Sequence, residues 1–107
     1  MNIINLTPHK VDICDENGNI VKTYPRSGKI ARVAHGWTNI NDVDGIPLVV
    51  RENEKITGLP EPQEDTMYIV SNIVFNFCSD RTDLIAPVKQ VTINGRVVGC
   101  RAFIGHK

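Results

Sequence analysis

The pair Asn94-Gly95 constrains the fold more than any other feature of the sequence. It stands between two runs rich in β-branched residues, over residues 90–93 and 96–103. Both positions of such a pair accept the positive φ angles of a type I′ turn, which matches the twist of two antiparallel strands. We therefore predict a hairpin with a two-residue loop, in which Val91 pairs with Val98. The predicted core face carries Val91, Ile93, Val98, Cys100 and Ala102.

A second hairpin is predicted near the N-terminus. Val11–Cys14 and Ile20–Tyr24 flank the polar turn Asp15–Asn19, and short β-branched runs bounded by turn residues are typical of strands. We interpret Ile30–Ala34 as a third strand of the same meander. The polar stretch His35–Asp44 is interpreted as a loop.

The middle of the chain contains two short apolar runs, Ile46–Val50 and Met67–Val70, which are typical of buried strands. Ser71 follows the second run and is a good helix N-cap. Apolar residues then recur at helical spacing over residues 73–77, which predicts one short helix that ends before Asp80.

The composition fits a single domain over residues 1–107. The chain is 41% hydrophobic and 22% charged, as in ordinary soluble globular proteins. We predict a mainly β (α+β) fold, a compact antiparallel sheet or barrel with one short helix. The 12 basic and 12 acidic residues give zero net charge, which argues against nucleic acid or membrane as a partner.

Little in the sequence indicates metal, cofactor or covalent chemistry. The three cysteines contain no Cys-x-x-Cys motif, so we expect reduced, mostly buried thiols. The three histidines have no metal-ligand spacing, and we predict neither a metal site nor a cofactor. The first residues resemble no signal peptide, and we therefore expect a cytoplasmic protein.

Charge is uneven along the chain. Residues 1–35 carry 5 basic and 3 acidic groups, residues 36–66 carry 2 and 7, and residues 67–107 carry 5 and 2. The acidic middle has two interpretations. It is either a solvated loop or a partner surface that faces away from a pocket formed by the two basic parts.

Polar residues gather in four clusters beside predicted strands. They are Asn5-Leu6-Thr7-Pro8-His9, residues 26–32 around Gly28, the strand end at Ser71, and Asp80-Arg81-Thr82-Asp83. Guanidinium groups suit phosphate oxygens, and a glycine turn can aim N–H groups at an anion. The predicted ligand-binding residues are Asn5, Thr7, His9, Ser27, Arg32, Ser71, Arg81 and Asp83.

Each cluster also has a purely structural interpretation. The first can be a turn whose side chains bond to backbone groups, and the second can be exposed strand charge. Ser71 can be only a helix cap. Arg81 can form an internal ion pair with Asp83 that orders its loop.

These same motifs resemble those of a family of small, largely uncharacterised proteins of bacteriophages and bacterial mobile elements. The resemblance spans nearly the whole chain and includes the Asn5–His9 motif, Ser27-Gly28-x-x-Ala31-Arg32, the Tyr-Ile-Val-Ser run ending at Ser71, and Arg81-x-Asp83. A proline of the family pattern is replaced here by Arg26. The resemblance implies a protein of the host-cell cytoplasm, in a context where some small phage proteins sequester nucleotide immune signals.

We therefore expect a non-enzymatic binder of a small anionic ligand, with a nucleotide signal in phage counter-defence as the expected ligand. Arg32 and Arg81 would both reach its phosphates, and a homo-oligomer could enlarge the pocket. The alternatives are a protein-protein inhibitor or adaptor that uses the acidic middle with Trp37 as an anchor, acting on a host protein, or a phage structural component. A hydrolase that uses His9 ranks last.

Overall fold

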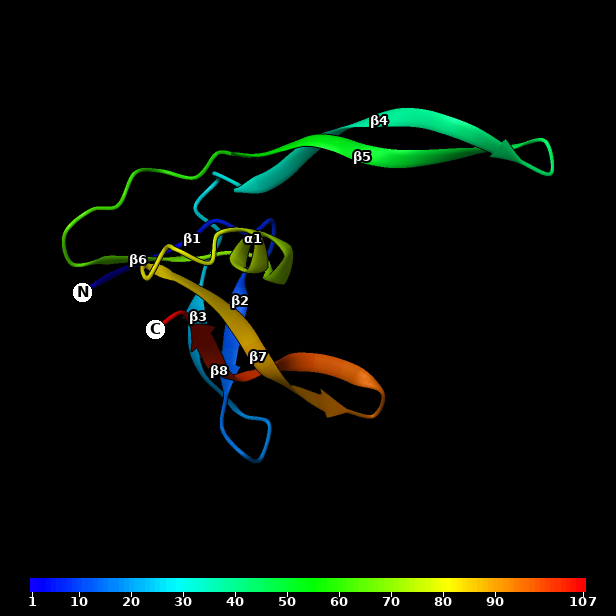
Figure 1. The fold of residues 1–107 in the computed structure, drawn as a ribbon. Helices are drawn as coiled ribbons and strands as arrows, with labels where there is room; N and C mark the ends of the chain where they lie inside the picture. Colours follow the sequence, from blue (N-terminus) through cyan, green and yellow to red (C-terminus); the bar gives the residue numbers. More distant parts are fainter.

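A six-stranded mixed sheet forms the body of the protein in the computed structural model, which describes residues 1–107 (Figure 1). Its spatial order is β1-β6-β7-β8-β2-β3. The strands are β1 (Asn2–Asn5), β2 (Val11–Cys14), β3 (Ile20–Tyr24), β6 (Thr66–Ile69), β7 (Leu84–Ile93) and β8 (Arg96–Gly105). The predicted mainly β class with one short helix is confirmed. The sheet is not purely antiparallel, because β1/β6, β6/β7 and β2/β8 pair in parallel.

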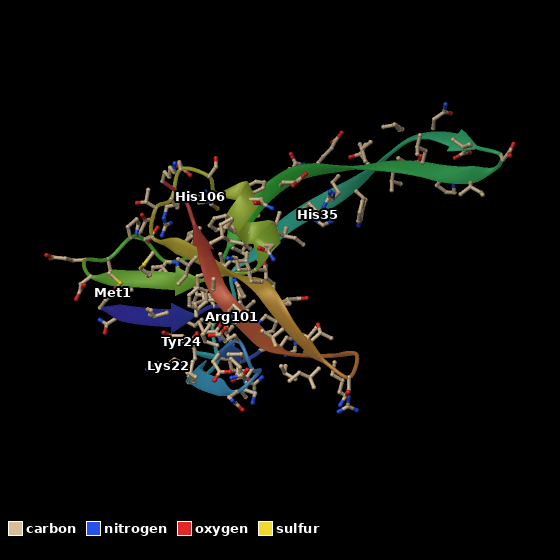
Figure 2. All side chains as sticks on the ribbon, turned by 90° about the horizontal axis from the view of Figure 1, so that it is seen from below. Met1, Lys22, Tyr24, His35, Arg101 and His106 are labelled. Atoms are coloured by element: carbon tan, nitrogen blue, oxygen red, sulfur yellow. The ribbon has the colours of Figure 1, made fainter.

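The helix α1 (Asn72–Phe77) lies in the connection between the parallel neighbours β6 and β7. Parallel strands need such a crossover, because a tight turn cannot join them. The Ser71 side chain accepts a hydrogen bond from the Val74 N–H at 3.3 Å, as predicted for an N-cap. His106, labelled in Figure 2, ties the C-terminus to the helix. Its ring stacks on that of Phe75, with the two ring centroids 3.8 Å apart. No helix in the structure is long and apolar enough to cross a bilayer.

The predicted C-terminal hairpin is present as β7 and β8. Asn94 and Gly95 have φ angles of 52° and 78°, and Ile93 pairs with Arg96 across the two-residue turn. The predicted pairing of Val91 with Val98 is wrong, because a register irregularity after Val91 places this residue opposite Gly99.

The sheet is covered on both faces by two apolar clusters. Successive residues of a strand point to opposite faces, so Tyr68 and Val70 join the cluster under α1 while Ile69 joins the other. The second cluster draws residues from all six strands: Ile3, Val11, Ile13, Tyr24, Met67, Ile69, Ile85, Cys100 and Phe103. The sheet therefore curls around a shared interior.

The two edge strands of the curled sheet meet at one corner. The Asn5 amide Nδ2 at the end of β1 donates to the Tyr24 carbonyl at the end of β3, at 3.0 Å. Immediately beyond β3, Arg26 forms a parallel bridge with Asn5. This corner closes the sheet at one end and fixes the loops that follow both strands.

The remaining two strands, β4 (Arg32–Val43) and β5 (Ile46–Thr57), form a separate hairpin that projects from the body (Figure 1). We call residues 32–57 the arm. Because of it, the Cα radius of gyration is 17.1 Å, against about 13 Å for a compact domain of this length. At its base, Val33 and Ile56 pack against the cluster under α1.

The arm corrects three predictions. Ile30–Ala34 is not a third strand of the N-terminal meander, since β4 begins at Arg32 and pairs only with β5. His35–Asp44 is a strand rather than a loop. Ile46–Val50 is a strand as predicted, but it is largely exposed instead of buried.

Candidate functional site

Three adjoining hollows surround the loop that follows β1. The first, of about 390 Å³, lies between Leu6–Pro8, Ile30–Val33 and the start of α1. The second and third measure about 350 and 330 Å³ and continue past Pro8 toward Arg26 and Lys10. We call these hollows together the basic groove. Its polar lining residues are Thr7, His9, Lys10, Arg26, Arg32 and Ser71.

The basic groove has a one-sided electrostatic character. No aspartate or glutamate lines any of its three hollows, whereas Lys10, Arg26 and Arg32 do. Only Lys10 has a carboxylate within ion-pair distance, Asp12 at 3.4 Å. Arg26 and Arg32 therefore keep their guanidinium groups free of internal ion pairs.

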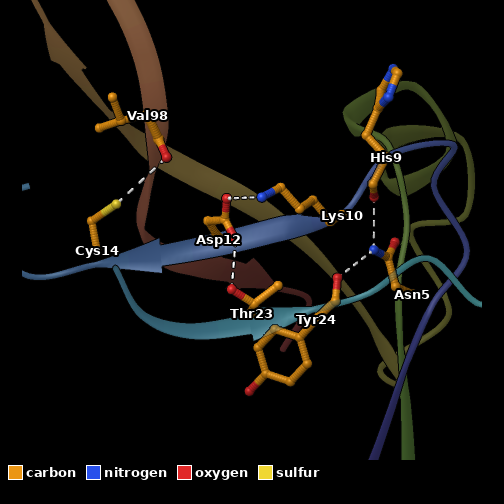
Figure 3. Close-up of polar contacts among 8 residues, drawn as sticks. All are labelled: Asn5, His9, Lys10, Asp12, Cys14, Thr23, Tyr24 and Val98. Carbon is orange, nitrogen blue, oxygen red and sulfur yellow. Dashed lines mark hydrogen bonds and ion pairs between the residues drawn. The ribbon is translucent and has the colours of Figure 1, made fainter. Parts of the chain in front are cut away.

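Asn5 builds the corner beside the groove and does not face a ligand. Its side chain is buried, and Nδ2 donates to the carbonyls of His9 at 2.8 Å and Tyr24 at 3.0 Å (Figure 3). Its Oδ1 accepts from the Thr7 N–H at 2.9 Å. These bonds use both amide hydrogens, so the structural interpretation of Asn5 holds and its predicted contact with a ligand has no free donor.

Ser27 also serves the fold. Its Oγ donates to the Asn5 carbonyl at 2.7 Å, and its backbone N–H donates to the same oxygen at 3.1 Å. The Lys29 N–H in turn donates to Ser27 Oγ at 3.2 Å. Ser27 thereby fastens the segment between Arg26 and Arg32 against the end of β1.

Three of the predicted residues, Thr7, Arg32 and Ser71, line the same hollow. The Thr7 hydroxyl lies 2.7 Å from Asn5 Oδ1 and 2.8 Å from the His9 carbonyl, so its single hydrogen serves one of them at a time. Ser71 uses its Oγ as an acceptor for the helix cap and retains its own hydroxyl hydrogen as a donor. The His9 ring lines the third hollow and points away from the Asn5 corner (Figure 3).

Arg81 and Asp83 lie outside the groove and neutralise each other. Arg81 donates through Nε and a terminal nitrogen to both Asp83 oxygens, each at 2.7 Å. A third bond reaches the Pro60 carbonyl at 3.0 Å. The hydrogen bonds from Arg81 hold the pKa of Asp83 below its usual value. The prediction that Arg81 joins Arg32 in binding the phosphates of one ligand is therefore corrected. Arg81 instead holds the loop at Pro60 in place.

The three cysteines are free and buried, as predicted. Burial raises the pKa of the Cys78 and Cys100 thiols, so both are protonated near neutral pH and are poor nucleophiles. A separate hollow beside β2 and β8 measures only about 160 Å³, which is smaller than a typical ligand site. No group of three histidine, cysteine, aspartate or glutamate side chains lies close enough together to hold a metal ion.

Two of the groove residues, Lys10 and Arg26, were not among the predicted binding residues. Arg26 stands in the cationic cluster around Gly28 and could have been included on that ground. Lys10 could not, because only the folded loop brings it near Arg26. No protein-family model, curated protein or solved structure significantly matches this chain.

Proposed function

We propose that this protein binds a small anionic ligand in the basic groove and releases it unchanged. One observation carries the proposal: two unpaired guanidinium groups line connected hollows that contain no carboxylate. In a chain of zero net charge, such a local surplus of positive charge is a specific arrangement, because no general field attracts anions.

The rest of the groove suits a ligand with phosphate and a flat apolar part. Arg26 and Arg32 offer forked donors for phosphate oxygens. Ser71 adds a hydroxyl donor, and the floor of the first hollow is apolar, with Leu6, Ile30, Val33, Ile73 and Val74. The volume of about 390 Å³ falls within the range of small-molecule sites. A nucleotide fits this description best.

In its biological setting, the protein would sequester a nucleotide immune signal as a phage counter-defence protein. This proposal rests on the groove together with the motif resemblance described above. Binding without turnover suffices for sequestration. The groove contains one histidine, His9, and no carboxylate or thiol that could act with it.

A thermal-shift screen with cyclic and linear nucleotides tests the proposal directly. A ligand at 100 times its Kd should stabilise the fold by about 2.7 kcal/mol. Arg32→Ala and Arg26→Ala should each weaken binding by about tenfold or more, since hydrogen bonds to charged groups contribute about 1.5–3 kcal/mol. Arg96→Ala is the matched control, because Arg96 is exposed at the far hairpin turn.

The ligand recovered after denaturation of the complex should be chemically unchanged. If no nucleotide or inorganic phosphate shifts the unfolding temperature, or if Arg96→Ala weakens binding as much as Arg32→Ala, the groove is not an anion site. Recovery of a hydrolysed ligand would instead establish turnover.

The arm favours a second candidate function, protein-protein contact by an inhibitor, an adaptor or a structural component. Trp37, which the sequence singles out as an anchor, is 65% exposed on it. A variant without the outer arm, residues 36–53, separates the two functions. It should retain nucleotide binding if the groove is the site, and lose any protein partner that the arm holds.

A further inference from the structure

The arm exposes far more apolar surface than a solvated hairpin needs. Trp37 and Ile46 are 65% and 66% exposed. Four other large apolar side chains on the arm are between 43% and 56% exposed: Ile40, Val43, Leu48 and Val49. Figure 2 shows the side chains of the outer arm projecting on both sides with no other element against them.

This exposure conflicts with the sequence of β5. A continuous apolar run such as Ile46–Val50 is typical of a strand that is covered on both faces, and an isolated two-stranded hairpin is at best marginally stable in water. Nothing within one copy of the chain covers the outer arm. Its sequence therefore indicates burial against a second molecule.

The surface area supports the same conclusion. The chain exposes 7514 Å² at a mass of 11.9 kDa, whereas a compact monomer of that mass exposes about 5,900 Å². A stable protein interface buries about 800 Å² on each partner. The accessible surface beyond that of a compact monomer is therefore larger than the area that one partner buries in such an interface.

The strand register separates the residues of the outer arm into two faces. Directly paired residues share a face, and alternate residues of one strand also do. On β4 Ile40 is the extra residue of a bulge between Asn39 and Asn41, so the alternation is shifted by one residue beyond it. Trp37 pairs with Arg51, Asn39 with Val49, and Asp42 with Pro47. We call these six residues the Trp37 face. The opposite face carries the pairs Thr38/Val50, Asn41/Leu48 and Val43/Ile46.

The Trp37 face is complementary to itself. Asp42 lies toward the tip and Arg51 toward the base, with Val49 between them on β5 and its partner Asn39 on β4. When two such faces meet with the arms antiparallel, the tip of each lies over the base of the other, so Asp42 of each copy comes close to Arg51 of the other. Val49 then meets its counterpart in the middle, and Trp37, the partner of Arg51, is covered by the tip of the second copy. Neither charge has an ion-pair partner within its own chain. The opposite face carries Val43, Ile46, Leu48 and Val50, has no charged residue in its three outer pairs, and stays uncovered when two Trp37 faces meet.

We propose that the Trp37 face binds the same face of a second copy of this chain across a two-fold axis. A two-fold interface requires a surface that complements itself, and the Asp42, Val49 and Arg51 arrangement meets this requirement. Zero net charge adds no general repulsion between copies. This contact uses a surface separate from the basic groove, and it is independent of the proposed ligand.

Sedimentation of the wild-type protein provides the first test. Over about 1–100 μM it should change from monomer to dimer. Trp37 is the only tryptophan in the chain, so its fluorescence emission should shift to shorter wavelength over the same range. A protein that remains monomeric throughout this range overturns the proposal.

Charge exchange provides the decisive test. Asp42→Lys places lysine against Arg51 at both contacts, and Arg51→Glu places glutamate against Asp42 at both. Each variant alone should dimerise at least about tenfold more weakly, because juxtaposed like charges are unfavourable. An equimolar mixture should form a mixed dimer of wild-type stability, since both contacts again pair opposite charges.

Asn41→Lys is the matched control, because Asn41 neighbours Asp42 but lies on the opposite face. It should dimerise like the wild type. The proposal is overturned if the two single variants dimerise normally, if their mixture remains monomeric, or if Asn41→Lys is as defective as Asp42→Lys. Circular dichroism confirms that each variant keeps its fold. A wild-type monomer that captures a different protein through the arm also overturns it.

Discussion

Asn5 holds the corner of the body with four different groups. Its amide donates to two backbone carbonyls, and its oxygen accepts from the Thr7 N–H and lies 2.7 Å from the Thr7 hydroxyl. From the sequence alone this residue can be a ligand contact or a backbone partner, because an asparagine side chain suits both. Burial decides for the backbone partner, since only 1% of Asn5 is exposed.

Asn5→Asp should therefore destabilise the protein by about 2–4 kcal/mol. The aspartate retains the acceptor oxygens but replaces the Nδ2 donor with an oxygen that faces two carbonyls, and buried groups without partners cost about 1–3 kcal/mol each. Chemical denaturation measures the loss. Asn2→Asp, at the exposed start of the same strand, is the control and should change little. Equal stability of both variants would contradict the role assigned to Asn5.

Tyr68 presents the opposite situation, a buried polar atom without a partner. The residue is 1% exposed, and its hydroxyl makes no hydrogen bond. Tyr68→Phe should leave the free energy of unfolding unchanged or raise it by about 1 kcal/mol, because the desolvation cost of the hydroxyl disappears. Tyr24→Phe, at a partly exposed position, should be neutral. A clear loss of stability in Tyr68→Phe would mean that the hydroxyl has a partner.

The Arg81–Asp83 pair predicts a defined pH dependence. Because the pKa of Asp83 is lowered in the folded protein, its contribution to stability is fully present above its unfolded pKa of about 3.9. That contribution is lost as the pH falls through the lower folded pKa. Asp83→Asn should cost about 1–3 kcal/mol at pH 7, and the difference from wild type should shrink in acid.

Urea denaturation at pH 7 and at about pH 2.5 measures this difference. Asp80→Asn serves as the control, because Asp80 is an exposed neighbour without an ion pair. If the wild type were more stable than Asp83→Asn by the same unfolding free energy at both pH values, the pair would not titrate as described.

The hairpins β4/β5 and β7/β8 share one kind of turn. Their strands differ in how clearly the sequence pattern predicts them. Asp44-Gly45 has φ angles of 54° and 76°, close to those of Asn94-Gly95. The same turn chemistry that correctly predicts β7 and β8 would also have predicted β4 and β5. The preceding segment His35–Asp44 has no apolar alternation that would mark it as a strand.

The missing alternation has a physical cause. Apolar residues alternate along a strand only where one face packs against a core, and the outer arm packs against nothing within its own chain. The register of β7 and β8 likewise differs from the predicted one. Val98 is the extra residue of a bulge between the partners of Val91 and Thr92, and no turn or breaker residue occupies that position.

The outer arm should be removable without loss of the body. Replacing residues 36–53 with Asn-Gly keeps the pairs near the base, such as Ala34 with Lys55, and keeps Val33 and Ile56 against the core. The unfolding free energy of the monomer should change by less than about 1 kcal/mol, because isolated hairpins contribute little stability. Thermal denaturation at low protein concentration measures it. Loss of the folded state would mean that the arm supports the body.

For the molecule as a whole, the sequence predicts the class of fold but not its connections. Short strands, turns and one helix follow from local chemistry, whereas the pairing of β2 with β8 joins Ile13 to Cys100 across most of the chain. The candidate site depends on such distant contacts. Thr7, Arg32 and Ser71 meet only after β1, the root of the arm and α1 have assembled.

Amide hydrogen exchange should distinguish the outer arm from the six-stranded body. In dilute protein the amides of the outer arm should exchange much faster than those of β6 and β7, because local opening is easy where few groups are buried. At concentrations where copies associate through the Trp37 face, the outer arm alone should gain protection. Uniform protection at all concentrations would contradict the division into arm and body.

The position of β8 between β7 and β2 has a consequence for biosynthesis. The N-terminal hairpin leaves the ribosome first, but its neighbour in the sheet is the last strand to be made. A nascent chain that stops before Arg96 lacks the piece that joins the two halves of the interior. Folding of the body therefore cannot be completed until β8 has been synthesised, and until then the early strands remain available to chaperones and proteases.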